Sequence, residues 1–264
     1  MSLFGKLERL ALGSVAFVLA NVVPMEKAGA QSPYYLENFQ FVPTGTEQTD
    51  RLNVGSKYAT WTSETDKGEE DVFALNLKNG KQTQITQGNQ DVRNLKTSGD
   101  NLMWIDVSSY PEKLNVWDEM NGVREISFGG EIRSADINNG DVAYSLRDYD
   151  SSGNNQIFLM RNGQIPMNIT LNNNYKDSVR ISENSVFWKE YVDGRQAIKR
   201  FDRENFITSD VYTEQVNNSS VDELAVSGKN IAWCVRYPIQ NYPDQTVLYF
   251  SDGTSIRYIG TMDD

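Results

Sequence analysis

Short apolar runs that end in a large aromatic residue recur five times along the chain, and a turn residue precedes each run. The aromatic residues lie 43, 40, 44 and 45 positions apart and are Trp61, Trp104, Tyr144, Trp188 and Trp233. A second mark follows each of them by 16 to 19 positions, as Asn79-Gly80, Asn121-Gly122, Asn162-Gly163, Glu204-Asn205 and Asp252-Gly253. Asn-Gly and Asp-Gly favour tight hairpins, because a type I′ turn needs positive φ at both central residues. Two marks with one period predict an internal repeat of roughly 40–45 residues, the length of a four-stranded propeller blade.

The strand that carries each aromatic residue is apolar on both of its faces. In the second repeat, Leu102 and Trp104 alternate with Met103 and Ile105, so neither face of this strand is polar. Such a strand must be covered on both faces, whereas a single antiparallel sheet leaves one face in water. Sheets stacked around an axis cover both faces. The pattern therefore predicts an all-β chain that forms a β-propeller of five four-stranded antiparallel blades.

The repeats divide residues 51–264 into five units, and we expect four short strands in each. The units are 51–91, 92–131, 132–177, 178–222 and 223–260. The third strand of each unit is expected at 71–77, 114–117, 156–160, 197–201 and 247–250. We predict no amphipathic helix of useful length after residue 30, and we expect each periodic aromatic residue to pack between two blades.

Residues 1–30 have the pattern of a secretory signal peptide. Lys6 and Arg9 precede an uncharged apolar segment at 10–23, and Ala28-Gly29-Ala30 fits a cleavage site. The apolar segment is shorter than the about 20 residues that a membrane-spanning helix needs. We therefore expect export to the periplasm or the exterior without stable membrane insertion. Residues 31–50 have none of the marks of a blade, and we interpret them as a leader with a candidate extra strand at 39–42.

Charge and composition exclude several classes of function. The formal net charge is −11, whereas a protein that binds nucleic acid needs a basic footprint. The chain has no histidine, which removes the commonest general base and excludes Ser-His-Asp and Cys-His sites. It has one cysteine, Cys234, so no internal disulfide can form.

The repeats resemble those of TolB-like β-propellers in exported bacterial proteins. The resemblance rests on GSKYATW at 55–61 with EEDVFALNLKNGKQTQIT at 69–86, and on GDNLMW at 99–104 with LNVWDEMNGVREIS at 114–127. The first three repeats end in an Ile-Thr or Ile-Ser pair, at 85–86, 126–127 and 169–170. The resemblance implies a propeller scaffold used for binding. TolB itself carries an α/β domain ahead of its propeller, and residues 31–50 are too short to form one.

Candidate binding residues lie in the loops that join the second and third strands of each unit, such as 190–196 in the fourth. Tyrosine and arginine are enriched at binding hot spots, and loops on a rigid scaffold often carry function. The candidates for a ligand-binding face are Tyr110, Tyr191, Asp193, Arg195, Arg236, Tyr237 and Tyr242. Exposed loops of β proteins are also polar and rich in tyrosine without any ligand, and this alternative stays open.

One stretch of a loop resembles half of a calcium site. Asp148, Asp150 and Ser152, followed by Gly153, match the first half of a calcium-binding loop. The bidentate glutamate is missing, because Leu159 stands at its position, and the same residue types are common in turns. We therefore expect no cofactor, with calcium at these three residues as the alternative.

Together these patterns predict an exported, non-catalytic and monomeric binding scaffold. Its partner would be a protein or a cell-envelope glycan, and not a nucleic acid. One alternative is a glycan-active hydrolase on the same scaffold, because Asp106, Asp148, Glu190 and Asp193 lie in loops where two carboxylates could pair. Another is a purely structural domain that associates with copies of itself. The lack of histidine and the similarity of the repeats favour the non-catalytic interpretation.

Overall fold

The computed structural model is all-β in the part of the chain that it describes. It describes residues 16–23, 35–43, 49–64, 69–88, 90–127, 129–147, 155–214, 219–238 and 245–262, and it describes side chains only outside 16–23, 35–43, 49–51, 127 and 262. Within these ranges there is no helix of the length and apolarity that a membrane crossing requires. By its contacts the chain divides into two compact parts, 1–92 and 93–264.

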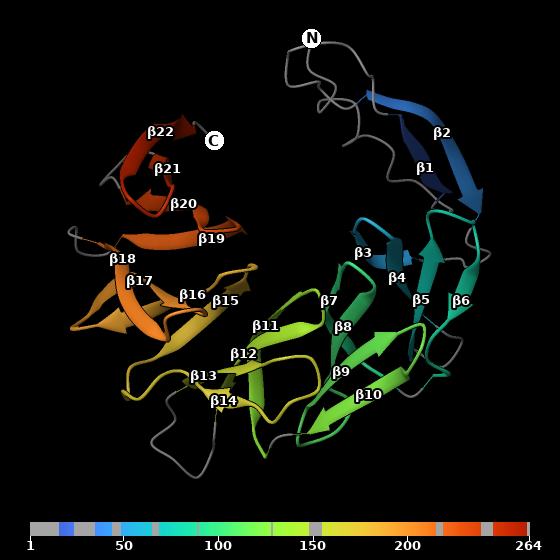
Figure 1. The fold of residues 1–264 in the computed structure, drawn as a ribbon, viewed down its shortest axis with the longest axis horizontal. Helices are drawn as coiled ribbons and strands as arrows, with labels where there is room; N and C mark the ends of the chain where they lie inside the picture. Colours follow the sequence, from blue (N-terminus) through green and yellow to red (C-terminus); the bar gives the residue numbers. More distant parts are fainter. Residues whose placement is uncertain are drawn as a thin grey trace. The chain divides into compact units, whose positions relative to one another are not determined.

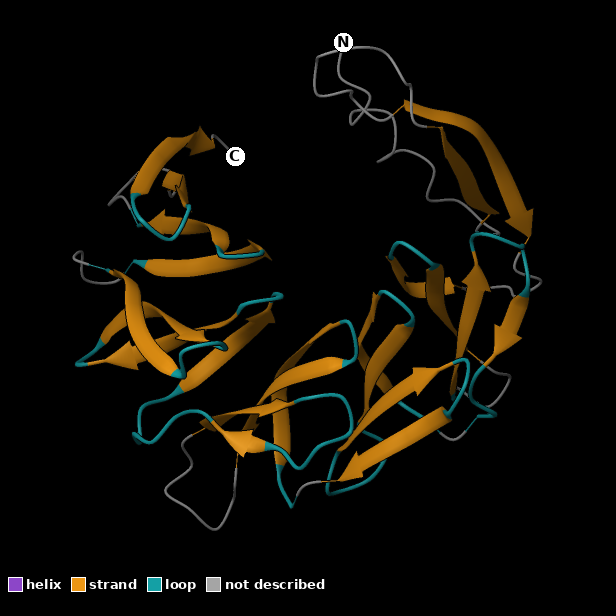
Figure 2. Cartoon of the chain, viewed as in Figure 1, coloured by secondary structure: helices purple, strands orange, loops and turns teal. Residues whose placement is uncertain are grey.

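Five four-stranded antiparallel sheets follow one another along the described chain, and in each the strands are neighbours in sequence order (Figure 1; Figure 2). The first comprises β3 (Thr49–Val54), β4 (Tyr58–Glu64), β5 (Glu70–Asn76) and β6 (Gln82–Gln84). The second comprises β7 (Val92–Ser98), β8 (Asn101–Asp106), β9 (Lys113–Asp118) and β10 (Gly122–Ser127). The third comprises β11 (Glu131–Asn138), β12 (Asp141–Arg147), β13 (Asn155–Met160) and β14 (Met167–Asn168). The fourth comprises β15 (Lys176–Ile181), β16 (Ser185–Val192), β17 (Arg195–Asp202) and β18 (Ile207–Thr213). The fifth comprises β19 (Ser220–Ser227), β20 (Asn230–Tyr237), β21 (Gln245–Ser251) and β22 (Ile256–Met262).

Two further strands lie ahead of the first sheet. β1 (Ala16–Val23) pairs antiparallel with β2 (Tyr35–Pro43), in a two-stranded sheet of their own. β1 falls within the predicted signal peptide, and β2 contains the candidate strand at 39–42 of the leader. The predicted cleavage site at 28–30 lies outside the described residues. The signal peptide and the domain boundaries at residues 30 and 50 therefore stay predictions.

The periodic aromatic residues are buried in the core, as the repeat predicts. Each of the five is at most 1% exposed. Within 93–264, Tyr144 packs in a cluster with Met103 of the preceding sheet. Trp188 likewise packs in a cluster with Ile157 of the preceding sheet. These clusters confirm, for both residues, the predicted packing between neighbouring sheets.

Strand β20 differs from the prediction, because only one of its faces is fully buried. Ile231, Trp233 and Val235 are buried, whereas Cys234 on the other face is half-buried. Trp233 packs in a cluster with Phe187 of the fourth sheet. Within 93–264, the fourth sheet is the one other sheet that contributes described side chains to this core cluster. It covers one face of β20, which explains why buried and half-buried residues alternate along this strand.

A side chain at the end of the third strand shapes the following turn in four sheets. Asn76, Asp118, Asp202 and Asp252 each accept hydrogen bonds from the backbone N–H groups two and three residues later. Such bonds stabilise a tight turn, because they satisfy N–H groups that leave the strand ladder. The turns between the third and fourth strands are therefore fixed by their own sequence.

Candidate functional site

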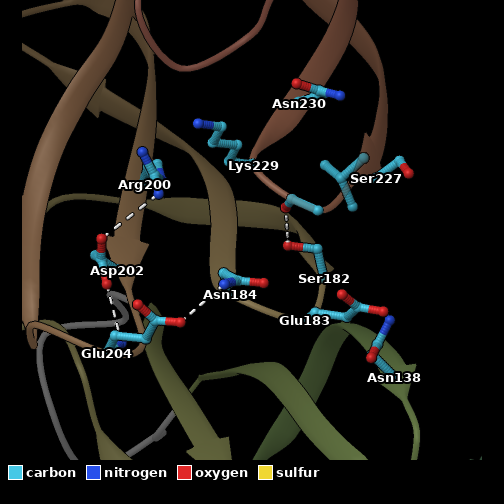
Figure 3. A pocket seen from close by; sticks show the side chains of 12 residues that line it. Asn138, Ser182, Glu183, Asn184, Arg200, Asp202, Glu204, Ser227, Lys229 and Asn230 are labelled. Atoms are coloured by element: carbon cyan, nitrogen blue, oxygen red, sulfur yellow. Dashed lines mark hydrogen bonds and ion pairs between the residues drawn. The ribbon is translucent and has the colours of Figure 1, made fainter.

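Three turns within 176–230 and the end of β11 surround a polar cavity of about 790 Å³, here named the turn pocket. It is lined by Asn138 at the end of β11, by 182–184 between β15 and β16, by Arg200, Asp202 and Glu204 around the β17–β18 turn, and by 226–230 around the β19–β20 turn. Figure 3 shows these side chains around the cavity. The third, fourth and fifth sheets thus all contribute side chains to the turn pocket.

The β15–β16 turn is held by hydrogen bonds from several directions. Ser182 N donates to Ser185 O at 2.8 Å. The Ser182 hydroxyl donates to Gly228 O, which ties this turn to the β19–β20 turn. Arg203 Nη1 donates to the backbone oxygens of Ser182 and Glu183 at 2.8 and 2.9 Å, and the Arg203 guanidinium also pairs with Asp141. The backbone that carries Glu183 is therefore fixed before any ligand arrives.

The β19–β20 turn depends on a glycine. Gly228 has φ of 57°, in the left-handed region that residues with a Cβ adopt at a cost. This conformation lets the chain reverse between Ser227 and Asn230, which pair across the turn. Lys229 is exposed at the tip of the turn. The turn thus presents a hydroxyl, an ammonium and an amide to the pocket within four consecutive residues.

The carboxylates of the β17–β18 turn are engaged in local bonds. Asp202 accepts from the backbone N–H groups of Glu204 and Asn205 at 2.9 and 3.0 Å. The bonds from Asn205 and Glu204 hold the pKa of Asp202 below its ordinary value. Glu204 accepts from Asn184 Nδ2 at 2.9 Å. Both acids therefore shape the wall of the pocket.

Other lining groups are free to bind a ligand. The side chains of Asn138, Glu183, Ser227, Lys229 and Asn230 make no hydrogen bond or ion pair with another described residue. An amide both donates and accepts, a carboxylate accepts, and an ammonium donates. Val226 is the apolar side chain in the lining. The pocket is therefore built for a ligand with many hydrogen-bonding groups, and not for an apolar one.

Two residues of the predicted loop face lie together at the opposite end of β17. Asp193 and Gly194 are the centre of a tight β16–β17 hairpin, with φ of 51° and 77°. The expected loop at 190–196 is thus mostly strand, since β16 continues to Val192 and β17 starts at Arg195. Asp193 and Arg195 line a second cavity of about 420 Å³ with Lys199.

Four other predicted residues line neither of these cavities. Tyr110 is 65% exposed in the β8–β9 loop. Tyr191 accepts a hydrogen bond from Gln196 Nε2 and packs edge-on against Tyr175. Arg236 Nε lies 3.2 Å from Asp222 Oδ2, and Tyr237 shares a hydroxyl–hydroxyl bond of 3.2 Å with Tyr249. A ligand-binding role of the loop face stays a prediction.

The remaining predicted site residues lie outside the described part of the chain. They are Tyr242 and the calcium candidates Asp148, Asp150 and Ser152. Among the described residues no group of three or more acidic or cysteine side chains is arranged to hold a metal ion. The calcium alternative on the three loop residues stays a prediction.

The sequence did not indicate the turn pocket. Asn138, Glu183 and Asn230 are ordinary turn residues, whereas the predicted binding residues are mostly tyrosines and arginines in the loops between the second and third strands. The available signal was the recurrence of turn residues one repeat apart, such as Asn184 and Asn230, because equivalent turns of stacked sheets lie at the same edge.

No model of a known protein family matches the sequence, and no curated protein matches it. Solved structures match it at low identity. The β-propeller domain of the Trilobed protease from Pyrococcus furiosus is 12% identical, with a TM-score of 0.62 over 86% of this chain and 73% of that chain. A putative TolB from Agrobacterium tumefaciens is 12% identical, with a TM-score of 0.56 over 85% of each chain. The acylaminoacyl peptidase from Pyrococcus horikoshii is also 12% identical, with a TM-score of 0.57 over 84% of this chain and 39% of the peptidase.

The fold is a β-propeller. Its five four-stranded sheets are the predicted blades. The likeness to TolB agrees with the resemblance of the repeats at the level of the fold. The chain spans about two fifths of the length of the acylaminoacyl peptidase, and the match extends to the fold alone.

Proposed function

We propose that this chain is an exported, non-catalytic β-propeller that binds a cell-envelope oligosaccharide in the turn pocket. The observation that carries the proposal is the lining of the cavity by unengaged amide, hydroxyl, carboxylate and ammonium groups on fixed turns. Ligand sites for apolar molecules are lined mainly by apolar side chains. Sugar hydroxyls both donate and accept, and side-chain amides such as those of Asn138 and Asn230 match them in both directions.

The state of the acids supports binding without catalysis. Glycoside hydrolysis needs a carboxylic acid that donates a proton and a second carboxylate at a suitable separation. A general acid has a raised pKa, whereas the pKa of Asp202 is lowered by backbone hydrogen bonds from Asn205 and Glu204. Glu204 is bonded to Asn184, which leaves Glu183 as the one carboxylate in the lining without a partner among the described residues.

Export and cell-envelope location rest on the N-terminal pattern, in which an apolar segment precedes Ala28-Gly29-Ala30. An exported binding propeller would be located where ligands of the cell envelope are present. The acidic chain, with a net charge of −11, is a poor partner for nucleic acid. We propose that it acts as a monomer, because one chain supplies every turn of the pocket.

Binding to purified cell-envelope oligosaccharides, measured by isothermal titration calorimetry, tests the proposal. The wild-type chain should bind at least one member of a panel that contains neutral, acidic and amino-sugar oligosaccharides. Asn230→Ala should weaken that binding about tenfold, which corresponds to about 1.4 kcal/mol. The matched control is Asn162→Ala, in an exposed turn outside the pocket, and it should bind like the wild type. Equal affinity of Asn230→Ala and the wild type, or no binding to any oligosaccharide, would overturn the proposal.

A further inference from the structure

Next to the turn pocket lies a smaller cavity of about 360 Å³, between the fourth and fifth sheets. Ser209 and Asp210 of β18 line one side, and Thr254 and Ser255 of the β21–β22 turn line the other. Arg200 and Lys229 line both cavities. The two spaces therefore meet at these two cationic side chains.

The side chains of Arg200 and Lys229 lie against the same turn, although they come from different sheets. A Cβ placed on Gly253 would be 3.6 Å from Arg200 Nη1 and 3.7 Å from Lys229 Cδ. In Figure 3 the Lys229 side chain extends toward Arg200. Like charges held close together repel, so an anion between them would turn a repulsive arrangement into an attractive one.

Among the described acids, Asp202 is the one that an ion pair joins to these two cations. Arg200 Nη2 lies 3.5 Å from Asp202 Oδ2, while Arg200 Nε donates to Ser185 Oγ at 2.8 Å. A guanidinium has five N–H donors, so donors remain for a ligand. Within the described part of the chain, no hydrogen bond or ion pair engages the Lys229 ammonium.

The acid inside the smaller cavity has its own partner. Asp210 is paired with Lys199 at 2.5 Å. The Thr254 hydroxyl donates to Asp252, and Asp252 also accepts from the backbone N–H groups of Thr254 and Ser255. Asp252 is further paired with Arg257 at 3.2 Å. The junction of the two cavities thus holds two cationic side chains, of which an ion pair joins only Arg200 to a described acid.

We propose that the oligosaccharide bound in the turn pocket is acidic, and that its carboxylate, phosphate or sulfate group binds between Arg200 and Lys229. This inference rests on the proposed function and adds the class of ligand. A planar guanidinium can bind two oxygens of such a group side by side, while an ammonium contributes a point charge. The sugar hydroxyls would then meet the amides of the turn pocket, and Ser209 and Ser255 would line the space around the acidic group.

The test compares matched oligosaccharides with and without an acidic group. The probes are oligogalacturonates against neutral galacto-oligosaccharides, and phosphorylated and sulfated oligosaccharides against their unmodified forms, with inorganic phosphate and sulfate alone. We expect an acidic member to bind at least tenfold more tightly than its neutral partner. Lys229→Gln should lower the affinity for the acidic member about tenfold more than the affinity for its neutral partner, because the ammonium charge meets the acidic group directly. This exposed side chain has no hydrogen-bond or ion-pair partner among the described residues, so the fold should be kept. Arg200→Gln should act in the same direction, with circular dichroism to confirm its fold.

The matched control is Lys57→Gln. Lys57 precedes the second strand of the first sheet, as Lys229 precedes that of the fifth, and it lies outside both cavities. It should leave all affinities unchanged. Neutral oligosaccharides that bind as tightly as acidic ones would overturn the inference and leave the proposed function intact. Binding of phosphate or sulfate that depends on Lys229, without binding of any oligosaccharide, would overturn the proposed function and keep the anion site. Equal loss in the Lys57 and Lys229 variants would overturn the assignment of the site to Lys229.

Discussion

A buried lysine and a buried glutamate are opposite each other on β15 and β16. Lys176 and Glu190 are register partners and are 0% and 2% exposed. Lys176 Nζ donates to the backbone oxygens of Asn155, Asn172 and Asn174 at 3.2, 2.9 and 2.7 Å. The side-chain amides of Asn172 and Asn174 each donate to Glu190 at 2.7 Å. Buried ions are tolerated where their hydrogen-bonding capacity is filled. The two charged side chains therefore stabilise the connection between the third and fourth sheets.

We predict that Glu190→Gln is less stable than the wild type at pH 7, by about 1–3 kcal/mol. Burial alone would raise the pKa of Glu190, but hydrogen bonds from Asn174, Trp188 and Asn172 and the charge of Lys176 hold it below its ordinary value. A carboxyl group with a lowered pKa in the folded state stabilises the fold above its unfolded pKa of about 4.3. That stability is lost as the pH falls through the folded pKa.

The free energy of unfolding of Glu190→Gln should consequently change less than that of the wild type between pH 7 and about pH 3. Denaturant unfolding at several pH values measures both quantities. Glu125→Gln serves as the control, because Glu125 is exposed and its ion pair with Lys113 should contribute little. Parallel stability curves for the wild type and Glu190→Gln would contradict the prediction.

At the scale of the element, a threonine hydroxyl replaces a backbone partner where the outer strand ends. In the first sheet, Thr86 Oγ1 accepts from Val72 N at 2.8 Å. In the third sheet, Thr170 Oγ1 accepts from Ile157 N at 3.0 Å and donates to Gln156 Oε1 at 2.8 Å. These threonines belong to the Ile-Thr pairs that end the repeats. The sequence mark thus has a structural role, which is to satisfy a buried N–H of the third strand.

We predict that Thr170→Val destabilises the protein by about 1–3 kcal/mol, because the isosteric side chain leaves the buried Ile157 N–H without a partner. The change keeps the shape of the side chain and removes the hydroxyl. Thr208→Val makes the same change at an exposed position of β18 and should stay within about 0.5 kcal/mol of the wild type. Denaturant unfolding compares the two variants. Equally small effects would show that the hydroxyl is dispensable.

Most strands could be predicted from the sequence, because each repeat contains a turn mark and a strand that is apolar on both faces. The expected third strands at 114–117 and 247–250 lie inside β9 and β21. The fourth repeat predicts a loop at 190–196 between its second and third strands, whereas the structure has a tight β16–β17 turn at Asp193-Gly194, a turn dipeptide that falls outside the period of the other marks. The turn dipeptides therefore indicated tight turns where they recurred with the repeat, but not at 193–194, where the dipeptide stands outside the period.

The site could be predicted less well than the strands. The positions of Asn138, Glu183 and Asn230 at turns follow from the repeat, but their approach to one cavity depends on how neighbouring sheets stack. Arg236 was expected in the loops because of its residue type, whereas its contact with Asp222 on the adjacent strand depends on the register of β19 and β20. Side-chain partners at this level are set by packing and register, which a single sequence specifies only indirectly.

At the scale of the whole molecule, the N-terminal sheet is separate from the five blades in its hydrogen bonding. β1 and β2 pair with each other, and no described sheet contains either of them with a blade strand. A two-stranded sheet is marginally stable in water. The five blades each have four strands without a contribution from 16–43. Removal of residues 1–30 would therefore take β1 and leave every described blade with its complete set of strands.

We predict that the exported protein begins at Gln31 or within a residue or two of it. The basic residues Lys6 and Arg9, the apolar segment and Ala28-Gly29-Ala30 motivate the prediction. Intact-mass measurement and N-terminal sequencing of the protein recovered outside the cytoplasm give the start. Signal peptidase needs small residues at 28 and 30. Ala30→Arg should therefore block processing, whereas Gly29→Ser, at the middle position of the same motif, should leave it unchanged.

The stability of the processed chain completes this prediction. Because β1 pairs with β2 alone among the described strands, the chain that begins at Gln31 should unfold at the same thermal midpoint as the full-length chain. A loss of 1 kcal/mol would shift the midpoint of a domain of this size by roughly 2–4 °C, so a contribution of β1 to the blades would be measurable. A midpoint several degrees lower in the processed chain, or recovery of only the full-length chain after export, would mean that the N-terminal segment belongs to the fold.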